Sequence, residues 1–219
     1  NGESPLSLAA AYASFGNKGY YNKPYSITKL VIRDTNETYE HKNSATKVMG
    51  EDTAYMVTSM LIDTAQYALG AYSYIPGITY GAKTGTTNFD DQTFIDKGLP
   101  YGAIKDLWVA GYDTEYAIAV WYGYDRIDPN YVSIWSTTYH SQLFQLAAKG
   151  IFKSPNKFEK PANVIEVQIE KETYPTMLPS EFTPKDMIIT ELFKEGTEPT
   201  EVSQRYAKLA NPTNLNAKS

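Results

Sequence analysis

The residues with the clearest capacity for chemistry are Lys83-Thr84-Gly85-Thr86-Thr87, at the end of a strand-like run that begins at Ile78. Side chains alternate between the faces of a β-strand, so Thr84 and Thr86 point the same way and place two hydroxyls along one side of a cleft. Lys83 and Gly85 share the opposite orientation, and the missing side chain at Gly85 lets another element approach beside the ammonium. Because the lysine can hold a proton or polarise a neighbouring hydroxyl, the pattern predicts a cleft-edge strand beside a nucleophile.

Backbone N–H groups along the same strand can face an acyl oxygen. An amide donor aimed at a developing oxyanion is typically worth roughly 3 to 4 kcal/mol, and we assign this donor to Thr86. A lone Lys-Thr-Gly triplet also occurs at exposed strand ends that have no function. The interpretation therefore depends on the rest of the chain.

Other residues that could suggest chemistry have plainer interpretations. The pair Asp90-Asp91 has no histidine or further carboxylate nearby and is interpreted as a solvated loop, in a polar segment (residues 88–105) that borders the groove. His140, near the start of a helix, is assigned a capping or surface role. The chain has no cysteine and only His41 and His140, so we expect no metal site, no cysteine nucleophile and no cofactor.

Composition excludes some classes of function. The 219 residues carry a net charge of -5, with a pI near 5.1, and lack the clustered Lys and Arg that bind nucleic acid. No apolar run approaches the roughly 18 residues that span a bilayer. The 19 tyrosines, such as Tyr122 and Tyr124, suit half-buried positions in a sheet, and a groove for sugars or peptides is the alternative.

Three helices are expected around the Lys83 strand. Ser4 is a suitable N-cap for the first, with Pro5 at the first helical position, and residues 17–19 end it. The second begins with acidic residues and covers about residues 51–69. The third covers residues 138–150, where its apolar spacing suits a helix packed on a sheet.

The strands predict an antiparallel sheet. Residues 78–87 form one strand, and residues 108–112 and 116–124 form a hairpin with a turn at 113–115. A smaller hairpin is expected within residues 25–39. The fold class is therefore α/β: an antiparallel β-sheet flanked by helices on both faces.

Three blocks of sequence, in a fixed order, extend the Lys83 motif, and they resemble the transpeptidase domain of penicillin-binding proteins. The opening segment from Ser4 is similar to the family helix that follows its Ser-x-Asn motif, and residues 196–200 resemble a closing element of the class A, bifunctional peptidoglycan synthases. By this resemblance, residues 1–152 are the C-terminal part of the transpeptidase domain. Residues 153–219, rich in proline, are expected to form an extended C-terminal tail. The blocks are Tyr80-Gly81-Ala82-Lys83-Thr84-Gly85-Thr86-Thr87-Asn88, Asp106-Leu107-Trp108-Val109-Ala110-Gly111-Tyr112 and Val120-Trp121-Tyr122-Gly123-Tyr124-Asp125.

The resemblance implies part of the fold shared by penicillin-binding proteins and serine β-lactamases, and a serine-type D,D-transpeptidase. In the family, a serine attacks the D-Ala-D-Ala carbonyl of a peptidoglycan stem peptide, releases D-alanine and passes the acyl group to an amine. β-Lactams mimic this donor and stay attached. By resemblance, Lys83 aids proton transfer, Thr84 and Thr86 bind the terminal carboxylate, and the Thr86 amide completes the oxyanion hole. Gly85 and Thr87 complete the expected substrate-binding set.

The family also needs a Ser-x-x-Lys and a Ser-x-Asn motif upstream of Lys-Thr-Gly, and neither appears where it should. Ser44-Ala45-Thr46-Lys47 is a literal match in a polar loop, and Ser154-Pro155-Asn156 comes after Lys83 in the wrong chain order. We interpret both as coincidences. The chain is expected to be a fragment whose partner is an upstream segment of the same protein that carries both motifs.

The resemblance also implies a location and leaves alternatives. The substrate lies outside the cytoplasmic membrane, so the expected place is the extracytoplasmic face of the bacterial cell membrane, held by an N-terminal anchor missing from this chain. A D,D-carboxypeptidase or β-lactamase would use the same motif with water as the acceptor. A non-catalytic domain that binds wall peptides or sugars through its tyrosine-rich surface is the alternative from another class.

Overall fold

The computed structural model of the chain describes residues 2–70, 72–153 and 157–206 and divides into two compact units, Asn1–Glu159 and Lys160–Ser219. Each unit has strands of its own, so each is described by itself. The division lies at Glu159, seven residues after the boundary at 152 expected from the sequence.

The first unit is built on an antiparallel sheet whose strands follow the order β5 (Gly81–Asn88), β6 (Ala103–Tyr112) and β7 (Ala117–Gly123). The short strand β8 (Ser133–Ile134) pairs with the start of β6. Within the described residues β5 is therefore an edge strand, as a strand that borders a cleft must be. The β6–β7 hairpin agrees with the sequence prediction.

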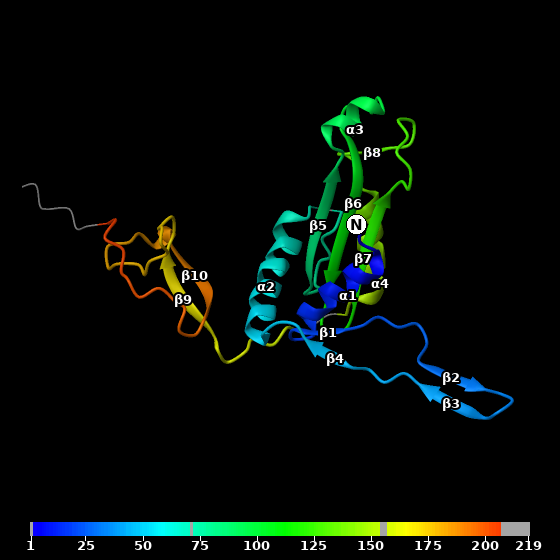
Figure 1. Cartoon of the computed structure of the whole chain (residues 1–219). Coiled ribbons are helices and arrows are strands. Elements are labelled where there is room, and N and C mark those ends of the chain that lie inside the picture. Colours follow the sequence, from blue (N-terminus) through cyan, green and yellow to red (C-terminus); the bar gives the residue numbers. More distant parts are fainter. Residues whose placement is uncertain (1, 71, 154–156, 207–219) are drawn as a thin grey trace, which may run out of the picture. The chain divides into compact units, whose positions relative to one another are not determined.

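Helices cover both faces of this sheet (Figure 1), as expected for the α/β class. Helix α4 (Tyr139–Ile151) packs on one face, where Phe144 joins Ala82 and Val109 in a cluster with exposures of 0%. Helices α1 (Pro5–Gly16) and α2 (Glu51–Asp63) lie on the other face, around the Tyr112 ring. Successive side chains on β6 contact these two faces in turn, because side chains alternate between the faces of a β-strand.

The buried Tyr112 side chain connects three elements of the first unit. Its hydroxyl is 2.8 Å from the Thr58 hydroxyl on α2, and its ring stacks on Phe15 of α1 with centroids 6.1 Å apart. Tyr112 is also the register partner of Gly81 at the start of β5. Burial raises the pKa of Tyr112, so the phenol stays neutral and serves as a hydrogen-bonding group.

The start of α1 agrees with the sequence prediction, whereas the end of α2 and the helix α3 do not. Ser4 caps α1 by accepting a hydrogen bond from the Ser7 amide at 3.2 Å, with Pro5 in the first turn. Helix α2 ends earlier than expected, at Asp63, and continues as a π-helical turn, η1 (Thr64–Ala68). The segment predicted as a polar loop after β5 contains the short helix α3 (Asp91–Asp96).

A hairpin arm extends from the first unit between α1 and α2. Strands β2 (Lys29–Ile32) and β3 (Glu37–Glu40) form the hairpin that the sequence predicts, with all of their residues exposed. At the base of the arm, β1 (Tyr20–Asn22) pairs with β4 (Ala45–Lys47), a pairing that the sequence analysis missed. The polar loop expected at residues 44–47 is thus largely a strand.

The second unit is folded, in contrast to the extended tail that its prolines suggested. Strands β9 (Val164–Glu170) and β10 (Ile188–Lys194) pair along their whole length, and a 3₁₀ turn, η2 (Lys185–Met187), precedes β10. The Glu170 side chain is 1% exposed and accepts hydrogen bonds from the hydroxyls of Thr183 and Ser203. One buried carboxylate therefore ties three segments of this unit together.

Candidate active site

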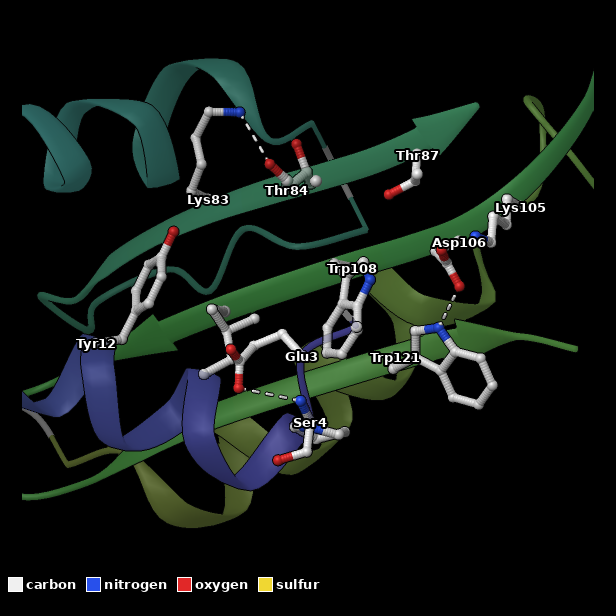
Figure 2. Close-up of a pocket in the computed structure, with 15 residues that line it drawn as sticks. Glu3, Ser4, Tyr12, Lys83, Thr84, Thr87, Lys105, Asp106, Trp108 and Trp121 are labelled. Carbon is white, nitrogen blue, oxygen red and sulfur yellow. Dashed lines mark hydrogen bonds between the residues drawn. The ribbon is translucent and has the colours of Figure 1, made fainter. Parts of the chain in front are cut away.

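A groove of about 800 Å³ lies between the N-terminal end of α1 and the β5–β6–β7 sheet (Figure 2). Four of the five residues singled out from the sequence contribute to its lining: Lys83, Thr84, Gly85 and Thr87. The register places Lys83 opposite Ala110 and Gly85 opposite Trp108, so these residues share one face of the sheet. The groove on this face is also lined by residues of α1.

The Lys83 side chain is exposed and lies along β5 at the groove. Its Nζ donates a hydrogen bond to the carbonyl oxygen of Thr84 at 3.0 Å (Figure 2). This contact holds the ammonium close to its own strand. The lysine is therefore accessible to a group that approaches β5 from the groove.

Gly85 leaves space above the strand. A Cβ added at Gly85 would meet only the Trp108 Cβ within 4 Å, at 3.4 Å, which is ordinary van der Waals contact. By contrast, a Cβ at Gly111 on the opposite face would lie 2.6 Å from the Phe144 ring. Packing within the described residues explains the glycine at 111 but does not explain the glycine at 85.

Thr86 differs from the sequence expectation in one respect, its absence from the groove lining. Thr84 contributes to the groove lining, but Thr86 does not, although both residues are on the same edge strand. Thr84 and Thr86 are two positions apart on β5, so their side chains share a face of the strand, as the sequence predicts, but only Thr84 is among the residues that line the groove.

The floor of the groove is aromatic. Trp108 and Trp121 are register partners on β6 and β7, and their ring centroids are 6.4 Å apart. The Trp121 indole Nε1 donates a hydrogen bond to the Asp106 carboxylate at 2.9 Å (Figure 2). This bond fixes the orientation of both side chains at one end of the groove.

Helix α1 supplies the facing wall through Leu8, Tyr12 and the residues around its N-cap. Burial raises the pKa of Tyr12, so its phenol stays neutral. The Glu3 carboxylate accepts hydrogen bonds from the Ser7 hydroxyl and from the Ser4 amide. The wall is thus apolar in its centre, with one carboxylate at its end.

The groove residues on β6, β7 and α1 were not singled out as site residues from the sequence. Asp106, Trp108 and Ala110 alternate along β6, which indicates a common face. That this face is also the one that carries Lys83 depends on the pairing of β5 with β6, and a single sequence does not fix the register. Tyr12 belongs to a helix that contacts the sheet only through tertiary packing.

The other sequence candidates do not join the groove. His140 is 7% exposed, and its Nδ1 has no hydrogen-bond partner among the described residues, so it is buried and not a surface residue. Burial lowers the pKa of His140. Asp90 caps α3 by accepting a hydrogen bond from the Thr93 amide at 2.8 Å, so the Asp90-Asp91 pair starts a helix.

The two literal serine motifs also lie elsewhere. Residues 45–47 of the Ser44 motif form the exposed strand β4, and Ser154-Pro155-Asn156 lies outside the described residues. Of the groove-lining residues, Ser4 is the one serine, and it caps α1 with Ser7, not a lysine, three positions later. The described residues contain no cluster of three or more potential metal ligands. Nor do they include a helix with the length and apolar character required to cross a membrane.

Models of two protein families match this chain. The penicillin-binding protein transpeptidase domain matches residues 3–144, and the C-terminal domain of penicillin-binding protein 1A matches residues 160–208. The second match begins where the structure places the start of the second unit.

Curated relatives extend over most of the chain. It is 34% identical over 216 residues to penicillin-binding protein 1A/1B of Bacillus subtilis, covering 95% of this chain and 23% of the relative. It is 37% identical over 152 residues to penicillin-binding protein 1A of Streptococcus pneumoniae, covering 67% of this chain and 21% of that protein. The chain therefore spans less than a quarter of the length of these relatives.

Solved structures support the fold. The penicillin-binding protein PonA1 from Mycobacterium tuberculosis superimposes with a TM-score of 0.53 and 27% identity, over 71% of this chain and 40% of that one. Penicillin-binding protein 3 from Mycobacterium tuberculosis, in complex with aztreonam, gives 0.50 and 19% identity over 70% of this chain and 37% of that one. The two family models match the two units of the structure, one each. This chain therefore belongs to the penicillin-binding protein transpeptidase family, and its transpeptidase part is followed by the C-terminal domain of the class A penicillin-binding protein 1A.

Proposed function

We propose that this chain forms one side of the active site of a peptidoglycan D,D-transpeptidase, and that a serine outside the chain carries out the covalent step. The observation that supports the proposal is the open groove at Lys83 and Gly85, on a strand whose sequence matches the family. The serine oxygen attacks the D-Ala-D-Ala carbonyl and the peptide bond breaks. The carbonyl carbon is then held as an ester on the serine, and the released D-alanine amine takes up the serine proton. An acceptor amine later forms an amide bond with the same carbon, the ester bond breaks, and the amine proton returns to the serine oxygen.

The chain supplies the groups that prepare this reaction. Lys83 presents an ammonium at the groove, where it relays a proton to or from the serine pair of the missing motifs. Thr84 and Thr87 line the groove and bind the terminal carboxylate of the donor peptide, with Thr86 beside them. The Thr86 backbone amide donates to the oxyanion. Gly85 leaves room for the approaching nucleophile.

The upstream segment that carries Ser-x-x-Lys and Ser-x-Asn is the proposed occupant of part of the groove. The Trp108 ring on the floor and Leu8 and Tyr12 on the wall form an apolar surface that suits a packed helix. In this arrangement the serine comes to Lys83 from the open side of Gly85. The complete protein acts on the extracytoplasmic face of the cell membrane, where it also reacts with β-lactams, and it is held there by an N-terminal anchor.

Labelling with a fluorescent penicillin tests the proposal. The chain is fused behind the preceding transpeptidase residues of the Bacillus subtilis relative, which supply both serine motifs. We expect the fusion to label covalently, the 219-residue chain alone to remain unlabelled, and Lys83→Met in the fusion to slow labelling at least about a hundredfold. Lys97→Met, on an exposed lysine after α3, is the matched control and retains full labelling.

The nature of the acceptor needs a second measurement on the same fusion. A donor peptide ending in D-Ala-D-Ala is supplied with and without an amine acceptor. A transpeptidase yields a cross-linked product that grows with amine concentration, whereas a D,D-carboxypeptidase yields only the hydrolysed peptide. A folded fusion that never labels would contradict the proposal and favour a non-catalytic wall-binding domain.

A further inference from the structure

The segment that follows α4 is attached to the rest of the first unit at two places. At the first, the Lys153 amide donates a hydrogen bond to the Asp113 carboxylate at 3.0 Å. Asp113 is 2% exposed and also accepts hydrogen bonds from the amides of Glu115 and Tyr116, which shape the β6–β7 turn. One buried carboxylate therefore holds the residue after α4 against the turn at the end of the sheet.

The second attachment is made by residues 157–159, which we call the strap. The half-buried Phe158 ring meets the Tyr112 ring edge to face, with centroids 5.8 Å apart and planes at 79°. Phe158 also lines a hollow of about 440 Å³ together with Phe15 of α1 and Tyr55 of α2. One side chain of the strap therefore lies where α1, α2 and the end of β6 meet.

The strap also carries an ion pair, which contributes less than the ring. The Lys18 Nζ is 2.7 Å from the Glu159 carboxylate and 3.3 Å from the Glu51 carboxylate. The three side chains are between 46% and 79% exposed, and ion pairs that water surrounds contribute little to stability. The Phe158 ring is therefore the main group that attaches the strap.

The Tyr112 ring links the strap to the wall of the groove. Tyr112 is 0% exposed, and its ring centroid is 5.8 Å from that of Phe158 and 6.3 Å from that of Tyr12. A Cβ added at Gly16 would lie 2.9 Å from the Tyr112 ring, so α1 packs against this ring without spare room. Tyr12 in turn lines the groove beside Lys83. Because close-packed interiors transmit displacements, one buried ring connects Phe158 to the groove wall.

We propose that Phe158 is a positioning residue for the transpeptidase reaction, because it holds Tyr112 and, through Tyr112, the α1 wall of the groove. The inference rests on the proposed function, in which an upstream segment packs on Leu8 and Tyr12 of this wall and carries the serine. Loss of the Phe158 ring lets α1 shift against the sheet. The shift moves the serine away from its place beside the lysine of β5.

This role predicts which step of the reaction changes. Thr84 and Thr87, which bind the donor carboxylate in the proposed function, are on β5 and do not depend on the position of α1. Capture of penicillin should therefore stay the same when the Phe158 ring is removed. The attack by the serine should become slower, because small displacements of reacting groups reduce the rate strongly.

Penicillin labelling of the fusion, measured over a series of penicillin concentrations, separates the two steps. For Phe158→Ala we expect the labelling rate constant at saturation to fall about tenfold, while the half-saturating concentration stays within about twofold of the parent fusion. Phe158→Tyr keeps the ring and should return the rate constant to within about twofold of the parent value. If Phe158→Ala does not fold, Phe158→Leu takes its place, with an expected loss of about threefold.

Two controls separate the strap from the second unit. Phe182 is 40% exposed and belongs to the second unit, so Phe182→Ala should label like the parent fusion. Insertion of Gly-Ser-Gly-Ser between Glu159 and Lys160 lengthens the connection between the units after the strap, and it should also leave the rate constant unchanged. Slowing by either control equal to that of Phe158→Ala would overturn the proposal.

The labelled fraction at the end of the reaction separates positioning from stability. It reports how much of the fusion is folded, whereas the rate constant reports the geometry of the folded molecules. A Phe158→Ala variant with a smaller labelled fraction and the parent rate constant would show that Phe158 only stabilises the fold. That result would overturn the proposal.

Hydrogen exchange distinguishes failure of this inference from failure of the proposed function. In the fusion, Phe158→Ala should increase exchange in residues 5–16 by about tenfold relative to Phe182→Ala. Unchanged exchange there would overturn the inference, whether or not the fusion labels. Faster exchange in a folded fusion that never labels would uphold the attachment of α1 and overturn the proposed function, together with the positioning role of Phe158.

Discussion

Two glycines on neighbouring strands of one sheet, Gly85 on β5 and Gly111 on β6, have different surroundings in this molecule. Gly111 faces the core, where a Cβ would lie 2.6 Å from the Phe144 ring and 3.0 Å from the Gly81 carbonyl oxygen. Gly85 faces the groove, where the same atom would make only an ordinary contact with Trp108. The difference separates a requirement of packing from a requirement of the proposed reaction.

Gly85→Ala should therefore change the free energy of unfolding by less than about 0.5 kcal/mol, whereas Gly111→Ala should lower it by about 1 to 3 kcal/mol. In the fusion described above, Gly85→Ala should nevertheless slow penicillin labelling at least about tenfold. Chemical denaturation and labelling kinetics measure the two effects. Equal losses of stability at both positions would show that the groove face is as tightly packed as the core.

The buried hydroxyl pair of Tyr112 and Thr58 offers a second test at the scale of single residues. The two oxygens are 2.8 Å apart, and Thr58 is 1% exposed. Tyr112→Phe leaves the Thr58 hydroxyl without this partner, and we expect a loss of about 1 to 2 kcal/mol. Thr58→Val removes the other side of the bond. In the double variant, the total loss in free energy of unfolding should be smaller than the sum of the losses of the two single variants. A double-variant loss equal to that sum would mean that the hydrogen bond contributes nothing to stability.

At the scale of elements, α4 carries a buried histidine, His140, whose Nδ1 has no hydrogen-bond partner in the part of the chain that the structure describes. Burial lowers the pKa of His140 below its ordinary value of 6.5. As the pH falls below 6.5, the unfolded chain takes up a proton at this position before the folded chain does. Proton uptake by the unfolded state alone favours unfolding, so this part of the stability is complete above pH 6.5 and is lost as the pH falls toward the pKa of folded His140.

His140→Gln should remove this contribution to the pH dependence. When the pH is lowered from 7 to 5, we expect the thermal unfolding midpoint of the parent chain to fall by a few degrees more than that of the variant. His41→Gln is the control, because His41 lies exposed in the hairpin arm, stacked on Tyr25. If the parent and the His140 variant lose stability in parallel, then carboxylates elsewhere account for the acid sensitivity.

The elements themselves could largely be predicted from the sequence, and the failures have physical causes. The Ser4 cap and the alternation along residues 108–124 are local signals, and the structure confirms both. The pairing of β1 with β4 joins short strands separated by the whole hairpin arm, and no local pattern encodes it. Tyr12 and Trp121 were missed as groove residues for the same reason, because only tertiary packing brings them to Lys83.

At the scale of the whole molecule, the second unit is the clearest departure from the sequence prediction. Its prolines suggested an extended tail, since proline interrupts regular structure. The structure instead pairs β9 with β10 and places Glu170 among hydroxyl groups. Glutamate side chains are almost always exposed, so the burial of the Glu170 carboxylate could not be predicted from the sequence.

Glu170→Ala should destabilise the second unit by about 2 to 4 kcal/mol, because it leaves the hydroxyls of Thr183 and Ser203 without their acceptor. Glu166→Ala, on the same strand, removes only an exposed ion pair with Lys160 and should cost at most about 1 kcal/mol. Hydrogen exchange followed by mass spectrometry measures each unit separately. Loss of protection in residues 81–123 in the Glu170 variant would show that the two units do not unfold independently.

The hairpin arm has a consequence for how this protein can change over generations. Since the side chains of β2 and β3 contribute nothing to a core, substitutions among them carry little penalty in folding, whereas the ladder and its turn at Asn36 fix the length and direction of the arm. We therefore expect the side chains of β2 and β3 to accept many substitutions without any effect on the folding of the sheet that carries Lys83.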